Sequence, residues 1–578
     1  MNILGISCFY HDAAAALVKE GLLTAACSEE RFTRIKQDPE LPKNAVAYCL
    51  ERGNLTMNDI DYIVFYDKPF LKFDRILTGY MGQPFRSYKA FLKALPVWLS
   101  RKLWTDHVIY KELGFEGEVL FIPHHLSHAA GTYFSSDFND SAILTIDGVG
   151  EWATASYGIG EGTTIKLLKE MHYPHSVGLL YSAFTYYLGF QVNSAEYKVM
   201  GLAPYGKPIY SDLIEEKIVK IHDDGSIHLN LDYFSFHYGL TMTNEKFEQL
   251  FNHPKREPEE ETDEFAENIA ASIQAVIEKI VLKMAAHVRQ ETGKTNLCLS
   301  GGVALNCKAN GLLLKQNIFD NIYVQPASGD AGGAVGCALY ASHKLSDGPK
   351  QKQPFFGIGP RHSANDCKTF LDKHNIPYKA QSEDETAETI AGYIAEGNIV
   401  AVYQGAMEFG PRALGFRSIL ADPRNNNMKE KINAAVKYRE PFRPFAPVVL
   451  QEDVADYFDC MGDSPYMLFN FKVKREKRSL IPAVTHIDNS SRIQTVTEYD
   501  NKILYKILCA FKKQTGLPVL LNTSFNLRGH AIVNKPEDAF ATFCSGGIDK
   551  MLLQAYIIDK TNVSNEIIEH FIFEKKLD

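Results

Sequence analysis

Three apolar segments of this chain each run into a glycine-rich turn, and this repetition constrains the fold more than any other feature. The turns read DGVG after SAILTI, SGGVALN after NLCL, and SGDAGGAVG after YVQPA. A strand followed by such a turn and a new helix places backbone N–H groups at a helix N-terminus, where phosphate groups bind. One such turn arises easily by chance, but three favour a nucleotide held between two α/β lobes.

Two histidines precede the first of these turns at a spacing of one helical turn. If His124 to Tyr133 is helical, His124 and His128 lie at i and i+4 on one face, and His125 points elsewhere. Two imidazoles on one face can share a cation. Taken alone, the spacing is more typical of ordinary surface or core histidines.

Two aspartates lie at positions where their carboxylates could bind a metal ion. Asp147 ends the predicted strand SAILTID, so its carboxylate should project from the carboxyl end of that strand, and Asp330 lies in the third turn. Gly148 and Gly150 let backbone approach an anion closely, and Asp147 can hold the cation that neutralises the anion. We therefore predict a combined metal and phosphate site.

The bulk composition is that of a large globular enzyme. The chain has 578 residues, 45% of them hydrophobic, so it can bury a sizeable core in two or more domains. The net charge of −9 argues against a nucleic-acid partner. Ten scattered cysteines without a C-x-x-C pair predict free thiols and a cytoplasmic location. No apolar run reaches about 18 residues, so no membrane span is expected.

The segment from Ser342 to Pro360 is polar and rich in proline and glycine. This composition predicts a linker, with domains over 1–350 and 351–578.

Two stretches show helical periodicity. Apolar residues from Phe265 to Val288 trace one face of a long helix. Lys68 to Glu112 combines many aromatic and basic residues at roughly helical spacing. We expect a helical excursion packed on its own domain with a solvated basic side, and a membrane-surface or partner-binding face is the alternative.

The second half of the chain supplies many cations from loops between apolar strands. Guanidinium groups match phosphate and carboxylate oxygens, so gathering them favours an anionic ligand. If they are dispersed, each is an ordinary surface charge. The cations concerned are Arg412, Arg417, Lys437, Arg439, Arg443 and Arg492.

Taken together, long ordered motifs make the chain recognisable. GISCFYHDAAA, PHHLSHA, DGVGE, YKVMGLAPYG, LSGGVALN, SGDAGGA, GPRALGFRSILADPR, PFRPFAP and LNTSFN occur in this order nearly from end to end. The chain resembles the NodU/CmcH family of O-carbamoyltransferases.

The resemblance implies an α/β protein with two active sites. The N-terminal domain would have the actin-like, sugar-kinase-like ATPase fold, similar to the tRNA threonylcarbamoyl transferases, and the C-terminal domain would be similar to YrdC. The C-terminal domain would hydrolyse carbamoyl phosphate to carbamate. The N-terminal domain would adenylate carbamate with ATP and transfer the carbamoyl group from carbamoyladenylate to a hydroxyl of a small-molecule acceptor. A homodimer is left open.

Site residues follow from the same resemblance. His11 matches the catalytic histidine, suited to deprotonating a hydroxyl. A divalent metal, expected to be iron with magnesium or manganese as alternatives, would be held by His124, His128, Asp147 and Asp330. The adenylate would lie against Gly148, Val149, Gly150, Gly301, Gly302 and Asn306. Carbamoyl phosphate would be bound by Arg412, Lys437, Arg443, Arg492, Asn522 and Ser524.

One departure and several alternatives accompany this hypothesis. The family motif often continues into Gly-Glu-Pro, whereas Gly529 is followed here by His530 and Ala531, which puts the contacts of that loop in doubt. A tRNA-modifying threonylcarbamoyl transferase would share the first domain, and a sugar kinase would share its lobes. A hydrogenase-maturation carbamoyltransferase would need zinc-binding C-x-x-C motifs. A noncatalytic scaffold would leave the many ligand-type residues unexplained. No motif identifies the acceptor.

Overall fold

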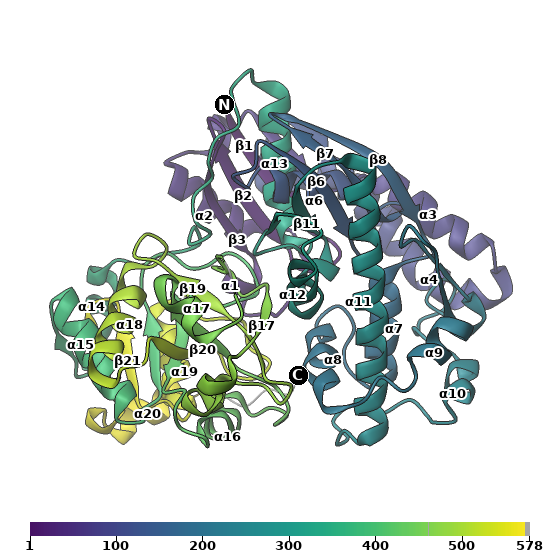
Figure 1. Ribbon diagram of the computed structural model, residues 1–578. Helices are drawn as coiled ribbons and strands as arrows, with labels where there is room; N and C mark the ends of the chain where they lie inside the picture. The colour runs from purple at the N-terminus through teal and green to yellow at the C-terminus, as the bar shows by residue number, and fades with distance from the viewer. Residues whose placement is uncertain (461, 573–578) are drawn as a thin grey trace. The chain divides into compact units, whose positions relative to one another are not determined.

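The computed structural model describes residues 1–460 and 462–572, and it divides into two compact units (Figure 1). The first unit comprises Met1–Glu29 and Gln37–Gln353. The second comprises Glu30–Lys36 and the chain from Pro354 onwards.

The first unit contains two five-stranded sheets with the same strand order and directions. In one sheet the order is β3-β2-β1-β4-β5, with β1, β2 and β3 antiparallel and with β4 and β5 parallel to β1. In the other the order is β8-β7-β6-β11-β12, with β6, β7 and β8 antiparallel and with β11 and β12 parallel to β6. The strands are β1 Asn2–Ser7, β2 Ala14–Lys19, β3 Leu22–Ser28, β4 Tyr62–Phe65, β5 Glu118–Phe121, β6 Asp140–Ile146, β7 Ala153–Glu161, β8 Thr164–His172, β11 Asn296–Ser300 and β12 Asn321–Val324.

This duplicated arrangement confirms the predicted fold class of the first domain. Each half has three antiparallel strands followed by two parallel strands, which gives the paired lobes of an actin-like, sugar-kinase-like fold. The first sheet begins with a tight hairpin between β2 and β3. Glu20 and Gly21 join β2 to β3 with φ of 52° and 84°, the left-handed backbone that a two-residue hairpin turn requires.

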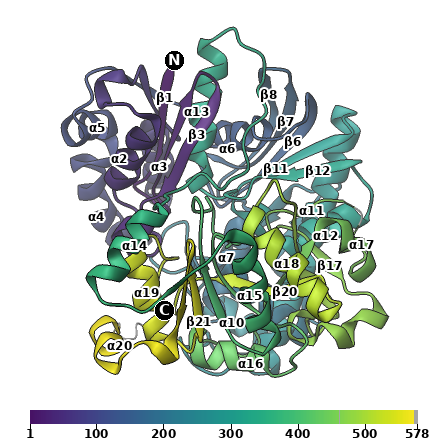
Figure 2. The same cartoon turned by 90° about the vertical axis from the view of Figure 1, so that its left-hand side faces the viewer.

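Helices α6 (His124–Tyr133) and α13 (Ala331–Leu345) pack directly against each other, and α13 also packs on β1 and β2 (Figure 2). A Cβ atom at Gly336 would lie only 1.8 Å from the carbonyl oxygen of Ser127 on α6. Only glycine permits this approach of the two backbones. The glycines of the third turn therefore serve helix packing, and this packing fixes Asp330, just before α13, beside α6.

Three helices connect the parallel strands β4 and β5, which confirms the predicted helical excursion. They are α3 (Pro69–Met81), α4 (Pro84–Ser100) and α5 (Thr105–Leu113). The expected solvated basic side is present in part, because Arg86, Lys89, Lys93 and Lys111 are exposed, but other side chains depart from it. Lys72 and Arg75 are only 7% and 8% exposed, whereas Met81 and Phe85 are 75% and 94% exposed. Two cations of this segment are thus buried while apolar side chains face outwards.

The predicted long helix is α11 (Glu264–Thr292), whose apolar face is buried. Asp263 caps it, because its side chain accepts a hydrogen bond of 2.8 Å from the N–H of Ala266. In the described part of the chain, no helix is both long enough and apolar enough to cross a membrane.

The second unit is built on a mixed eight-stranded sheet in the order β13-β22-β21-β14-β15-β20-β16-β19. The central strands are fully buried, and α15 (Glu383–Ala395) packs with α18 (Lys502–Thr515) beside them. The strands are β13 Lys379–Ala380, β14 Val400–Tyr403, β15 Arg417–Ala421, β16 Ala446–Leu450, β19 Gln494–Val496, β20 Val519–Ser524, β21 Lys550–Leu553 and β22 Tyr556–Asp559. The predicted anion-binding residues lie in different settings. Asn522 and Ser524 are on β20, Lys437 ends a helical turn (Asn433–Lys437), and Arg492 ends β18 (Ser490–Arg492) of a separate two-stranded sheet.

Candidate functional site

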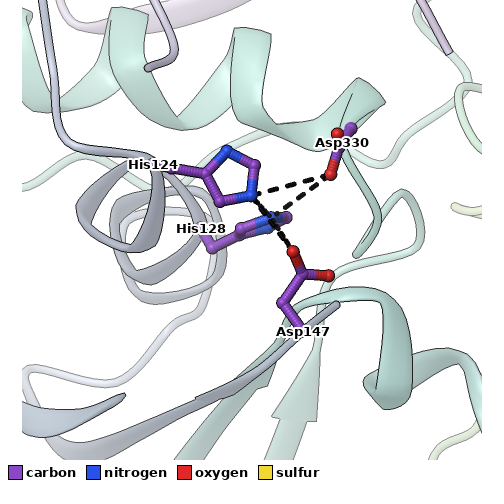
Figure 3. Close-up of side chains that lie close together, drawn as sticks. All are labelled: His124, His128, Asp147 and Asp330. Atoms are coloured by element: carbon purple, nitrogen blue, oxygen red, sulfur yellow. Dashed lines mark hydrogen bonds and ion pairs between the residues drawn. The ribbon is translucent and has the colours of Figure 1, made fainter. Parts of the chain in front are cut away.

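Four predicted side chains from three elements converge in the first unit (Figure 3). His124 and His128 lie on successive turns of α6, Asp147 follows β6, and Asp330 precedes α13. The two Nε2 atoms are 3.1 Å apart. His124 Nε2 lies 3.1 Å from Asp147 Oδ2 and 3.7 Å from Asp330 Oδ1, and His128 Nε2 lies 3.9 Å and 3.7 Å from the same oxygens.

Two of these distances fit the edges of a metal coordination shell, and the other three, at 3.7 to 3.9 Å, are slightly longer. Metal–nitrogen and metal–oxygen bonds of about 2.0–2.2 Å place neighbouring ligands about 3.0–3.5 Å apart. All four side chains are buried, with exposed fractions from 1% to 10%. Two carboxylates and two imidazoles together supply the charge and the donor atoms that suit a divalent cation, and this mixed donor set is compatible with iron or manganese.

Electrostatics keep both carboxylates ionised. Burial raises the pKa of Asp147, but the hydrogen bond to His124 and the charge of His128 outweigh burial and hold that pKa well below its usual range. Burial likewise opposes ionisation of Asp330, whose pKa is nevertheless lowered by His11 and His124. Both groups are therefore available as anionic ligands at neutral pH.

His125 faces away from this cluster, as its place on the helix predicts. Its Nδ1 lies 2.9 Å from the Ser156 hydroxyl. Burial and then the charge of His124 lower the pKa of His125 to about 3, so His125 stays neutral.

Backbone and carboxylate groups hold the cluster in place. The N–H of Gly302, in the second glycine turn, donates to Asp147 Oδ1 at 2.8 Å. Glu151 accepts the N–H of His124 at 3.0 Å and the N–H of Lys68 at 2.8 Å, so one carboxylate joins the starts of α6 and α3. From the sequence we assigned Glu151 no role, although its position at the end of the DGVGE motif offered a signal.

His11 lies at the edge of the cluster. Its Nε2 is 3.8 Å from Asp330 Oδ2, and its Nδ1 is 2.9 Å from Asp12 Oδ2. Burial lowers the pKa of His11, but Asp330 and Asp12 together raise it to about 9. A divalent cation on Asp330 would offset that carboxylate charge and favour the neutral imidazole.

The predicted nucleotide-binding residues divide into two groups. Gly148, Val149 and Gly150 follow β6, and Gly301 and Gly302 follow β11, so their backbones lie beside Asp147. Asn306 differs, because its side chain caps α12 (Cys307–Lys315) and exchanges two hydrogen bonds, of 3.0 and 3.1 Å, with Gln274.

In the second unit, Lys437 and Ser524 are in direct contact. Lys437 is 4% exposed, and its Nζ donates to the Ser524 carbonyl oxygen, to the Ser524 hydroxyl at 3.2 Å and to Asn526 Oδ1 at 2.8 Å. Burial, followed by the charges of Arg439 and Arg443, lowers the pKa of Lys437 well below its usual range. An anion placed here would restore the charged form. From the sequence we assigned Asn526 no role.

Asn522 connects the segments that carry Arg412 and Arg492. Its amide nitrogen donates to the carbonyl oxygen of Ala413 at 3.2 Å and to Gln494 Oε1 at 2.7 Å. Ala413 follows Arg412, and Gln494 lies two residues beyond Arg492. The loops that bear these two arginines therefore meet at Asn522.

Arg417 does not belong to an anion site, contrary to our grouping of it with the other cations. It is fully buried, its guanidinium lies 3.7 Å from the ring centroid of Tyr403, and it donates to backbone carbonyls that include Gln404 at 2.7 Å and Pro360 at 3.1 Å. Its role is structural.

The duplicated sheets with a buried histidine–aspartate cluster, and the mixed sheet with its buried lysine, define a two-domain α/β protein with a candidate metal site in its first unit. Comparison of the sequence with models of known protein families identifies the family. Residues 2–339 match the model described as carbamoyltransferase N-terminus, and residues 391–560 match the model described as carbamoyltransferase C-terminus. The chain belongs to the carbamoyltransferase family.

Similar proteins cover most of the chain. An uncharacterized protein of Synechocystis sp. is 46% identical, covering 97% of this chain and 97% of that protein. Nodulation protein NolNO of Sinorhizobium fredii is 37% identical over 96% of this chain and 80% of that protein. A 3'-hydroxymethylcephem-O-carbamoyltransferase of Amycolatopsis lactamdurans is 35% identical over 44% of this chain and 47% of that enzyme.

Proposed function

We propose that this carbamoyltransferase uses ATP and carbamoyl phosphate to carbamoylate a hydroxyl of a small-molecule acceptor. Water first cleaves carbamoyl phosphate into carbamate and inorganic phosphate. A carbamate oxygen then attacks the α-phosphorus of ATP, giving carbamoyladenylate and pyrophosphate. The acceptor oxygen attacks the carbamoyl carbon, AMP leaves, and the hydroxyl proton passes to a base.

The observation that carries this proposal is the buried cluster of His124, His128, Asp147 and Asp330 beside glycine turns. These residues would hold a divalent metal, for which we propose iron, with magnesium or manganese as alternatives. When bound, the metal supplies positive charge that neutralises nucleotide phosphates. The backbones of Gly148 to Gly150, Gly301 and Gly302 would lie against the adenylate.

His11 is placed to act as the base. It lies next to Asp330 at 3.8 Å, and its other ring nitrogen is oriented by Asp12. An imidazole held from one side in this way can accept the proton of an attacking hydroxyl on the other.

For the carbamoyl phosphate site we propose Arg412, Lys437, Arg443, Arg492, Asn522 and Ser524. Lys437 and Ser524 are already in contact. The segments that carry Arg412 and Arg492 meet at Asn522. Cations and an amide around one pocket would stabilise the phosphate leaving group. The side chain of Asn306 caps α12 and is hydrogen-bonded to Gln274. Asn306 would therefore support the glycine turn at the nucleotide site without touching the nucleotide.

A hydroxyl acceptor is supported by the relative named as a hydroxymethylcephem O-carbamoyltransferase. Two alternatives share the first-domain fold. A sugar kinase would transfer the γ-phosphoryl group and release ADP. A tRNA-modifying threonylcarbamoyl transferase would need a nucleic-acid partner, which the net charge of −9 disfavours.

The test does not require the acceptor. Reversal of the adenylation step should exchange labelled pyrophosphate into ATP, and this exchange should depend on carbamoyl phosphate. Omission of carbamoyl phosphate is the control. Formation of ADP in place of pyrophosphate exchange would reject the adenylation mechanism.

A further inference from the structure

A cavity of about 160 Å³ lies in the first unit beneath the helices that join β4 to β5. It opens between the loop that follows β1 and helices α3 and α4. One side is apolar and aromatic, with Phe9, Phe65 and Trp98. The other side carries Lys72, Arg75 and Lys102 with a single carboxylate, Asp67.

Arg75 is the unusual residue of this cavity. Its side chain is only 8% exposed, and its guanidinium lies 4.9 Å from the ring centroid of Tyr173. Its Nε is buried without a hydrogen-bond partner, and within residues 1–460 and 462–572 no carboxylate forms an ion pair with it. A buried cation is normally paired, because removing its charge from water without compensation is costly.

The remaining charges of the cavity do not compensate Arg75. Lys72 and Asp67 neutralise each other across 2.7 Å. Lys102 lies over the ring of Trp98 at 5.4 Å, and burial followed by the charge of Lys72 lowers its pKa. The cavity lining therefore has a net positive charge. Glu151, which does not line the cavity, raises the pKa of Arg75 without outweighing burial, so the guanidinium has no paired anion among residues 1–460 and 462–572.

The cavity adjoins the proposed reaction centre through one layer of aromatic rings. Tyr10 borders the cavity, and its ring centroid lies 4.6 Å from that of His11. Lys72 Nζ lies 5.2 Å from the ring of Tyr10 and 5.7 Å from the ring of Tyr66. Tyr66 in turn packs edge-on against His124 at 5.3 Å. A molecule bound in the cavity would lie beside both the base and the metal ligands.

We propose that this cavity binds the carbamoyl acceptor, and that the acceptor carries an oxyanion, a carboxylate or a phosphate, that pairs with Arg75. The fork of a guanidinium matches both groups. An aromatic or other apolar part of the acceptor would pack on Phe9, Phe65 and Trp98. The assignment of the ligand as acceptor rests on the proposed function, whereas the anion site rests on the cavity and Arg75.

Binding tests the anion site without turnover. The probes are 4-(hydroxymethyl)benzoate, its phosphonate analogue, and the neutral 4-(hydroxymethyl)benzamide, titrated calorimetrically into the full-length protein. At least one anionic probe should bind about tenfold or more tightly than the amide. Arg75→Gln should abolish the difference. Lys89→Gln, which removes the same charge from an exposed position of α4, should preserve it.

The two anionic probes distinguish a carboxylate from a phosphate. Equal affinity of the benzamide and both anions, or an unchanged preference in Arg75→Gln, would overturn the anion site. Displacement of the anionic probe by ATP would assign the cavity to the nucleotide and overturn the acceptor assignment.

A stability measurement tests whether Arg75 has only a structural role. Because an uncompensated buried cation destabilises the unliganded protein, Arg75→Leu should raise the thermal unfolding midpoint while losing the anion-dependent shift. A lower midpoint for Arg75→Leu would mean that the guanidinium supports the fold, and the proposal would fail.

The half-reaction separates this inference from the proposed function. Pyrophosphate exchange that depends on carbamoyl phosphate needs no acceptor, so it can be measured in the wild-type protein independently of binding to the cavity. Absence of exchange in the wild type, together with charge-selective binding, would reject the proposed function and retain the anion site. Pyrophosphate exchange without charge-selective binding would retain the proposed function and reject the anion site.

Discussion

The Nε2 atoms of His124 and His128 lie 3.1 Å apart, and both lie within 4 Å of oxygens from Asp147 and Asp330. Two imidazoles at this distance repel if both are protonated, and the two buried carboxylates repel each other as well. A cation between them removes both repulsions. The arrangement of these residues is therefore compatible with one shared metal ion.

Replacing His128 by alanine should remove one ligand and lower metal retention by at least about tenfold. Metal content per chain, measured by mass spectrometry after gel filtration, checks this outcome. Pyrophosphate exchange should be lost in parallel, because the nucleotide phosphates would lose their counter-charge.

His125→Ala is the matched control for this variant, since His125 is a buried neighbour on the same helix whose Nδ1 lies 2.9 Å from the Ser156 hydroxyl and which is not one of the four proposed ligands. It should retain the metal. A His128→Ala protein that is free of metal and still fully active would reject the metal assignment.

Gly336→Ala should weaken metal binding without altering any ligand. The added methyl group would meet the Ser127 carbonyl oxygen at 1.8 Å and push α13, with Asp330, away from α6. Overpacking of this kind costs about 1–3 kcal/mol. Calorimetric metal titration and the unfolding midpoint should both report the change.

Gly392→Ala offers the comparison, because a methyl group there meets no atom closer than 3.8 Å. Alanine is favoured over glycine within a helix, so this variant of α15 should be unchanged or slightly more stable. Equal metal affinity in the two variants would contradict the role of close helix packing.

Arg412→Ala and Arg492→Ala should each lower phosphate release from carbamoyl phosphate by about 100-fold or more, since leaving-group charge is stabilised by such donors. ATP binding should survive. Synthetic carbamoyladenylate should restore transfer to an accepted alcohol. Lys513→Ala, which breaks an exposed ion pair with Glu388, is the control and should behave as wild type. If carbamoyladenylate fails to rescue the first two variants, the division of labour between the domains is wrong.

Anion binding in the second unit should depend on pH through Lys437. Its ammonium form, which binds anions, is present below its lowered pKa and is lost as pH rises through that value towards the ordinary lysine pKa of 10.5. Sulfate affinity should therefore fall by up to about tenfold per pH unit above the lowered pKa. Equilibrium dialysis across this range measures the slope, and sulfate keeps a constant charge throughout.

Lys437→Met, which has a similar length and no charge, should bind sulfate weakly at every pH. The wild-type protein should approach that affinity at the alkaline end. A pH-independent wild-type affinity would show that Lys437 does not contribute its charge to the site.

Local pattern predicted the elements that carry the chemistry. The helix over His124 to Tyr133 and the long helix from Glu264 to Thr292 follow from side-chain periodicity, and the fold class followed from long motifs in a fixed order. The proximity of Asp330 to the histidine pair required the resemblance, because 183 residues separate Asp330 from Asp147. Their roles as metal ligands remain a prediction.

Burial and partner choice were harder to predict, because distant residues decide them. Arg417 has the sequence context of an anion-binding arginine, yet carbonyl groups from other loops enclose it. Asn306 follows a nucleotide-type turn, yet its side-chain amide donates a hydrogen bond to Gln274 on α11. Arg75 lies in a segment whose composition suggests a solvated basic face, and only the packing of α3 shows that it is buried.

The connection between β4 and β5 contains α3, α4 and α5, whereas the matching connection between β11 and β12 contains only a short 3₁₀ turn and α12. The two halves of the first unit therefore differ at this connection, and they differ again between the third and fourth strands, where the connection from β8 to β11 is much longer than the one from β3 to β4. Under the proposed assignments, part of the acceptor cavity is formed by the segment between β4 and β5, and the proposed metal ligands lie outside that segment. Such an arrangement lets acceptor preference evolve by exchange of one contiguous insertion, and it marks 68–117 as the natural unit for grafting specificity between related enzymes.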